Sequence, residues 1–226
     1  MWAIKSFNDW FFLSKMIFEL QESLNQSAAN NQKREVWLEL SEKALFYCNR
    51  NFIGTEVSFS EPALHIIRYL RCSLFWMTQD WDNFEKEIDI ALKENYSPIF
   101  FIIRAFYSLY FLVDKNMFSL DKSLNPSMFK MLRYKNSFIK EAEMYFNKAL
   151  SEINKQKEPH LRSSILWGKS WILFKLKKEV DMAEYVNKAW NADGNNIGEG
   201  WQLWAQWMGR FIDPIDNLIL LDHIKK

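Results

Sequence analysis

A chain of 226 residues that is 49% hydrophobic and 25% charged is long enough to bury a sizeable core and too apolar to be disordered. Six glycines and five prolines are few for this length, which disfavours an all-β chain with many turns. The formal net charge is only +1, far from the strongly basic balance that is typical of a nucleic-acid-binding domain.

Apolar residues recur at helical spacing along the chain, and no segment alternates with period two for long enough to predict a strand. Each of the five prolines precedes an apolar-periodic stretch, as expected in the first turn of a helix. These prolines are Pro62, Pro98, Pro126, Pro159 and Pro214. Asp82 and Glu85 also form a capping-box pattern. Helices are expected near residues 2–24, 32–49, 61–78, 82–94, 98–114, 127–135, 137–155, 160–177, 179–191, 197–210 and 214–224.

The most apolar stretch, Ile99–Val113, is shorter than the roughly 18–20 residues that span a membrane, and it contains Arg104. We therefore expect a buried core helix at this position. The N-terminal residues lack a signal-peptide layout because Lys5 and Asp9 interrupt the apolar run. The sequence thus predicts a cytoplasmic protein without a membrane span.

The two cysteines, Cys48 and Cys72, stand in apolar helical patterns and form no CxxC pair. This arrangement favours buried thiols in a reducing compartment over a disulfide. One domain over residues 1–226 is expected, and the segment 114–127 is the best candidate for an internal boundary.

Two segments share a pattern of small and large apolar residues. Ala142, Phe146 and Ala149 have a spacing that lets two helix backbones approach while the aromatic ring fills the groove between them. Residues 68–98 contain Cys72 and Phe75 in one helical stretch, then Asp80-Trp81, Ala91 and finally Pro98. Residues 166–194 repeat the pattern less regularly.

These segments resemble the tetratricopeptide repeat, a unit of two antiparallel helices, over about residues 60–195. The resemblance implies an all-α protein whose roughly nine to eleven helices form hairpins stacked as an α-α superhelix. The alternative is a helical bundle in which the small and aromatic residues coincide with the repeat pattern by chance.

Motifs of catalysis and metal binding are missing from the sequence. The three histidines, His65, His160 and His223, stand in no HExxH motif and in no cluster with cysteine. Phosphate-binding loops and nucleophile elbows are also missing, and the glycine-rich tract 194–200 follows a helix, which favours a C-cap and a turn. We therefore expect no enzyme, no metal and no cofactor.

Charge is distributed unevenly along the chain. Residues 115–178 contain 14 basic and five acidic residues, a net charge of +9. Three interpretations stay open: lysines spread over solvated helix faces, a site for an acidic protein partner, or a site for nucleic acid.

Tryptophans cluster near the C-terminal end. Trp201, Trp204 and Trp207 follow one another at helical spacing, which predicts core positions. The alternative is an exposed surface for a partner or for self-association.

In tetratricopeptide-like folds, the first helix of each hairpin lines a concave groove. Carried onto this chain, the resemblance implies a non-catalytic adaptor, chaperone or regulatory subunit that binds an acidic protein or peptide in such a groove. Nucleic-acid binding and an immunity-type or inhibitor subunit of a larger complex are the alternatives. The groove residues expected from the resemblance are Tyr69, Ser73, Trp76, Lys130, Tyr134, Arg162 and Lys169.

Overall fold

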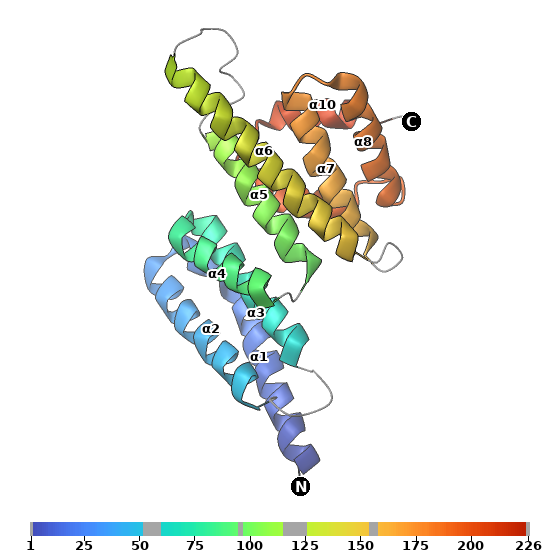
Figure 1. Ribbon diagram of the computed structural model, residues 1–226. Coiled ribbons are helices and arrows are strands. Elements are labelled where there is room, and N and C mark those ends of the chain that lie inside the picture. The colour runs from blue at the N-terminus through green and yellow to red at the C-terminus, as the bar shows by residue number, and fades with distance from the viewer. Residues whose placement is uncertain (1, 52–59, 95–96, 115–125, 154–157, 225–226) are drawn as a thin grey trace. The chain divides into compact units, whose positions relative to one another are not determined.

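The computed structural model describes residues 2–51, 60–94, 97–114, 126–153 and 158–224, without the side chains of residues 2–10, 49–51, 60–62, 114 and 126–133. This part of the chain contains ten α-helices and no strand, so the predicted all-α class is confirmed. The helices are α1 (Trp2–Ala29), α2 (Asn31–Asn51), α3 (Ser60–Thr78), α4 (Trp81–Glu94), α5 (Pro98–Asp114), α6 (Pro126–Glu152), α7 (Pro159–Lys175), α8 (Glu179–Ala192), α9 (Glu199–Met208) and α10 (Pro214–Asp222) (Figure 1).

Most helix starts lie where the sequence predicted them, and all five prolines fall in the first turn of a helix. Two details were wrong. The stretches 127–135 and 137–155 belong to the single helix α6. The residues at their junction, Asn136 and Ser137, are neither glycine nor proline and therefore do not break the helix. The cap of α4 is Asp80 rather than Asp82, since the Asn83 backbone N–H donates to Asp80 Oδ1 at 3.4 Å.

The helices divide into two compact units, Met1–Ser97 and Pro98–Lys226. The division falls at the loop before α5. The segment 114–127, which the sequence favoured as a boundary, belongs to the second unit and lies mostly outside the described residues.

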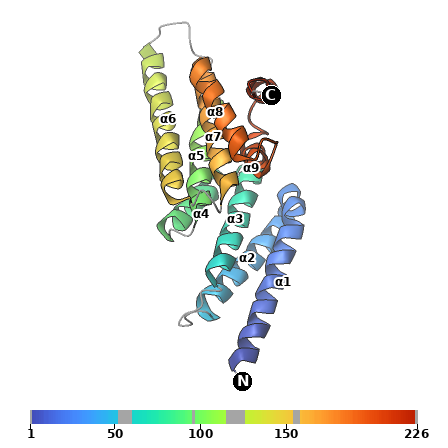
Figure 2. The ribbon, with the colours of Figure 1, turned by 90° about the vertical axis from the view of Figure 1, so that its right-hand side faces the viewer.

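In the first unit, α1, α2 and α3 pack against one another, and α4 packs against α3 (Figure 2). Trp37 is 2% exposed, and its indole N–H donates to the Leu20 carbonyl at 2.9 Å. Cys48 and Cys72 are both buried and free, which confirms their predicted core positions. Burial raises the pKa of the Cys48 thiol to about 11.

A buried ionic network joins α3 to α4. Glu87 accepts from Arg68 Nη1 at 2.7 Å and from Arg71 Nε at 2.9 Å. The second carboxylate, Glu94, accepts from Arg68 Nε at 2.9 Å, and Arg71 Nη1 donates to Ser41 Oγ at 2.6 Å. The Arg68 and Glu87 side chains are only 9% and 6% exposed, so these charges depend on one another for compensation.

In the second unit, α7 is the central helix and contacts α5, α6, α8, α9 and α10. Small residues make this possible, because Ser163, Ser164, Gly168 and Ser170 are all buried on α7. The buried hydroxyl groups bond to backbone carbonyls; for example, Ser163 Oγ donates to the Ala189 carbonyl of α8 at 2.9 Å.

The predicted small–aromatic–small stripe on α6 is buried. Ala142, Phe146 and Ala149 are each 0% exposed. The Phe146 ring meets the Phe106 ring edge-on, with centroids 5.9 Å apart, and it lies over Gly168 of α7. The expected core helix at α5 is also confirmed, and its Arg104 donates to Glu141 Oε1 of α6 at 3.1 Å.

The glycine-rich tract is a turn between α8 and α9, as predicted. Gly194 follows the end of α8 with φ 76°, a conformation that favours glycine. The Asp193 carboxylate then accepts from the backbone N–H groups of Gly200 and Trp201, both at 3.1 Å, and so caps α9.

Gly200 marks the closest approach of α9 to α7. A Cβ atom at this position would stand 2.4 Å from Ser163 Cβ and 2.7 Å from the His160 carbonyl oxygen. We expect Gly200→Ala to lower the free energy of unfolding by about 2 kcal/mol, because a backbone atom cannot move aside cheaply. Urea unfolding measures this loss, and Gln202→Ala, on the exposed side of α9, is the matched control. Equal stability of the two variants would contradict the close approach.

Among the described residues, no helix combines the length and the apolar character that crossing a membrane requires.

Candidate functional site

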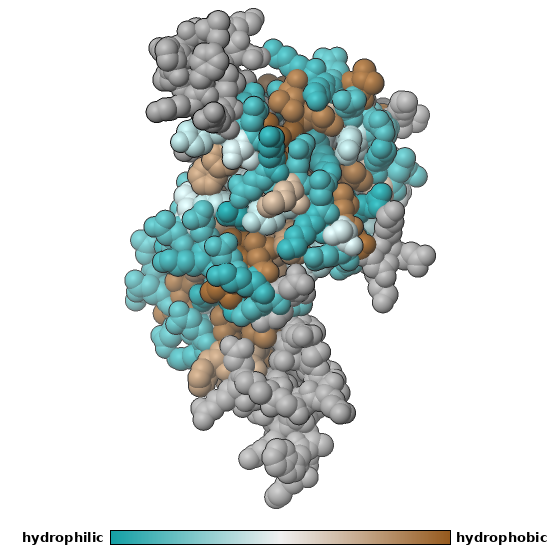
Figure 3. All heavy atoms as spheres, viewed as in Figure 1, coloured by the Kyte–Doolittle hydropathy of each residue, from teal (hydrophilic) through white to brown (hydrophobic). Residues whose placement is uncertain are grey.

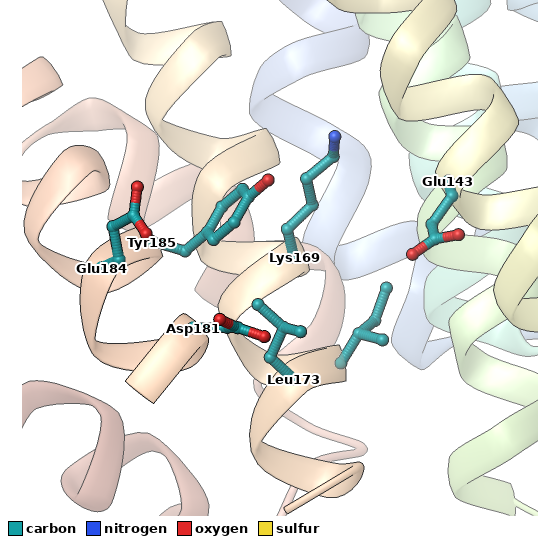
Figure 4. A pocket seen from close by; sticks show the side chains of 7 residues that line it. Glu143, Lys169, Leu173, Asp181, Glu184 and Tyr185 are labelled. Atoms are coloured by element: carbon teal, nitrogen blue, oxygen red, sulfur yellow. The ribbon is translucent and has the colours of Figure 1, made fainter. Parts of the chain in front are cut away.

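A pocket of about 290 Å³ opens among α6, α7 and α8 of the second unit (Figure 4). Its lining residues come from all three helices: Glu143, Lys169, Ile172, Leu173, Asp181, Glu184 and Tyr185. The site thus depends on the packing of two successive hairpins and on no single sequence motif.

The floor of the pocket is apolar. Ile172 and Leu173 of α7 provide aliphatic surface, and Ile172 is only 2% exposed. On α8, Met182, Val186 and Ala189 are 0% exposed and hold the helix to its neighbours. This packing turns the adjacent face of α8, which contains Asp181, Glu184 and Tyr185, towards the pocket.

Three carboxylates surround this floor on two sides. Glu143 reaches the pocket from α6, while Asp181 and Glu184 reach it from α8, on the side of Tyr185 (Figure 4). Glu184 forms an ion pair with Lys188, one turn further along α8. Within the described part of the chain, Glu143 and Asp181 have no salt-bridge partner within 4.0 Å.

Among the residues that the structure describes, Lys169 is the one basic residue that lines the pocket. Its ammonium group donates to Asn147 Oδ1 of α6 at 2.8 Å, and its side chain passes between Tyr185 and Glu143 (Figure 4). Burial lowers the pKa of Lys169, whereas the neighbouring Glu143 raises it. One lysine and three carboxylates give the lining a formal charge of −2.

The groove residues expected in the first unit are largely inaccessible. Ser73 is 4% exposed and its hydroxyl donates to the Tyr69 carbonyl at 2.9 Å, while Trp76 is 2% exposed. The Trp76 ring packs against the rings of Trp81 and Phe84 within the α3–α4 hairpin. The expectation that Ser73 and Trp76 line an open groove was therefore wrong, since both face the helical core. Tyr69 is half-buried.

The expected residues of the second unit lie on α6 and α7. Tyr134 is 59% exposed on α6, and Arg162 is half-buried two turns before Lys169 on α7. Lys130 belongs to α6, but its side chain lies outside the described residues. Of the six expected residues whose side chains the structure describes, only Lys169 lines the pocket.

The tryptophan cluster is mostly core. Trp204 and Trp207 are 0% and 1% exposed, which confirms the core interpretation and excludes both side chains from an exposed interface. Trp201 is half-buried, and its ring meets that of Trp167 edge-on with centroids 4.7 Å apart.

The carboxylates and the tyrosine of the pocket were missed by the sequence interpretation. Asp181 and Tyr185 are four residues apart, and each precedes a buried residue, Met182 and Val186 respectively. This spacing is the sequence signal that Asp181 and Tyr185 share one edge of a packed helix. Nothing in the sequence indicates that Glu143 faces them.

The first unit has a different kind of exposed surface. Large apolar side chains on α1 and α2 are more than half exposed to solvent: Phe11 62%, Phe12 51%, Phe18 61%, Val36 63% and Phe46 61%. Where such side chains form a contiguous patch, the surface is typical of those that bind other proteins.

Among the described residues, no group of three histidine, cysteine, aspartate or glutamate side chains is placed to hold a metal ion. Comparison of the chain with protein-family models, with curated proteins and with solved structures finds no match in any of the three.

Proposed function

We propose that this protein is a non-catalytic interaction module with tetratricopeptide-like helical hairpins, and that it holds a segment of a partner protein in the pocket among α6, α7 and α8. The observation that carries the proposal is the composition of this pocket, an apolar floor inside a rim of charged side chains from three helices. Such a combination offers burial for an apolar group and orientation by polar contacts.

The helical architecture supports this proposal over catalysis. Adjacent helices pack in pairs in each unit, and a hairpin array presents side chains of successive helices along one surface. The apolar side chains exposed on α1 and α2 add a second surface suited to protein contact. An adaptor, a chaperone and a regulatory or inhibitory subunit are all proteins of this kind.

Nucleic-acid binding through residues 115–178 receives less support. Basic side chains of this segment are engaged at separate places: Lys175 with Asp216 at 2.5 Å, Lys169 with Asn147, and Lys148 over the Phe101 ring at 4.3 Å. Hydrophilic residues cover much of the face shown in Figure 3, and residues 115–178 contain five acidic residues beside the 14 basic ones. A phosphate backbone requires a continuous row of cations instead.

Site-specific photo-crosslinking tests the proposed pocket. A photoreactive amino acid at Leu173, on the pocket floor, is expected to capture a discrete protein in the native host. The same group at Ile215, which is 61% exposed on α10 and therefore more accessible than the half-buried Leu173, is the control outside the pocket. Crosslinking of the same proteins with the same yield at both positions would refute the pocket as the binding site.

A further inference from the structure

We propose that the pocket among α6, α7 and α8 accepts a lysine or arginine side chain of the partner, so that the recognised segment is basic with apolar neighbours. This inference rests on the proposed function, because it assigns a chemistry to the occupant of the same pocket. The sequence alone favoured an acidic partner, on the strength of lysines and arginines expected in the groove.

The carboxylates of the pocket lining are complementary in charge to a lysine or arginine side chain. Glu143 of α6 and Asp181 of α8 enter the lining from different helices, and among the described residues neither has a salt-bridge partner within 4.0 Å, although Glu143 interacts with Lys169 at longer range. A cation placed between them gains from both carboxylates at once, whereas an anion would be repelled by both. Carboxylates also accept the charge-assisted hydrogen bonds that ammonium and guanidinium groups donate.

The position of Lys169 also agrees with a basic occupant. Its ammonium group is already bound to Asn147, so it is directed towards α6 and away from Asp181. Lys169 therefore leaves Asp181 available, although its own charge weakens the attraction for an incoming cation. Removing that charge should strengthen the binding of a basic segment and weaken that of an acidic one.

The size of the pocket and its apolar surface fit a lysine or arginine side chain. A volume of about 290 Å³ lies near the lower limit of ligand pockets, so it suits one side chain better than a cofactor. Lysine and arginine have aliphatic stems that pack on apolar surface while the charged end stays among polar groups. Ile172, Leu173 and the Tyr185 ring provide that surface below the carboxylates.

The test uses the full chain and four pools of short acetylated and amidated peptides. The central residue is arginine, lysine, glutamine or glutamate, and the flanking positions are mixtures of leucine, alanine and serine. Fluorescence anisotropy at low ionic strength measures the affinities. We expect the arginine and lysine pools to bind best, and their affinity to fall about five- to tenfold in the double variant Glu143→Gln, Asp181→Asn. Lys169→Met should raise their affinity a few-fold.

The matched control is the double variant Glu152→Gln, Glu179→Gln. Glu152 and Glu179 are exposed on α6 and α8 but do not line the pocket, and Glu179 shares the first turn of α8 with Asp181. This control should bind the basic pools like the unchanged protein. Equal binding of these pools to both double variants would overturn the inference.

Two other outcomes separate the inference from the proposed function. Preferred binding of the glutamate pool, lost in Lys169→Met, overturns the basic occupant but leaves the pocket as a binding site. Failure of all four pools also overturns the basic occupant, and the crosslinking yield at Leu173 then decides independently whether a partner uses the pocket.

Discussion

Replacing Phe146 by alanine is expected to lower the free energy of unfolding by about 3–5 kcal/mol. The ring is 0% exposed and lies between α5 and α7, where it contacts Phe106 and covers Gly168. Its removal leaves a cavity that the helices cannot close without moving together. Urea unfolding followed by circular dichroism measures the loss.

The control for this substitution is Met144→Ala, which removes a large apolar side chain that is 54% exposed on the same helix. It should change stability by about 0.5 kcal/mol or less. The converse experiment is Gly168→Ala, whose new Cβ atom would stand 2.6 Å from Phe146 Cζ. Gly168→Ala is measured in the unaltered protein and in the Phe146→Leu variant. If it lowers the free energy of unfolding equally in both, Phe146 and Gly168 do not determine how closely α6 and α7 approach.

Glu87→Ala is the second substitution with a large expected effect, a loss of about 3 kcal/mol in the free energy of unfolding. Glu87 accepts hydrogen bonds from both Arg68 and Arg71, and its side chain is 6% exposed. After the substitution, Arg68 retains Glu94, whereas Arg71 retains only the Ser41 hydroxyl among its described hydrogen bonds. A buried guanidinium without its carboxylate is costly, since it has lost both water and its counter-charge.

Asp89→Ala serves as the control for Glu87→Ala, because Asp89 is exposed on the same helix two residues further on. Chemical denaturation of both variants gives the comparison. A loss in Glu87→Ala no greater than that in Asp89→Ala would show that the network of α3 and α4 contributes nothing to stability.

The helices could be predicted from the sequence because their signals are local. Proline in the first turn and apolar residues at helical spacing depend only on neighbouring residues. The joined helix α6 shows the limit of this reasoning, because polar residues such as Asn136 and Ser137 lower helix propensity without ending a helix. The central place of α7 was also missed, because serines count as polar residues when a helix face is predicted from sequence. The serines of α7 can be buried because their hydroxyl groups donate to backbone carbonyls.

The candidate site was only partly predictable. Lys169 was found because the repeat pattern assigns α7 as the first helix of a hairpin. Glu143 and Asp181 could not be paired from sequence, because they lie on helices whose mutual rotation is fixed by the packing of Phe146 on Gly168 and of α8 on α7. Ser73 and Trp76 were misplaced for a related reason: residues three or four apart share a face, but the spacing does not say which neighbour that face meets.

Both cysteines of the chain, Cys48 and Cys72, belong to the first unit. Burial raises the pKa of both thiols, so both stay protonated near neutral pH, while the thiolate is the form that attacks alkylating reagents. Modification of the native protein therefore has to wait until the first unit opens. The unaltered chain thus contains a chemical reporter for the opening of one unit alone. The ratio of the alkylation rate in the native protein to that in the unfolded chain gives the free energy of that opening without any engineered label.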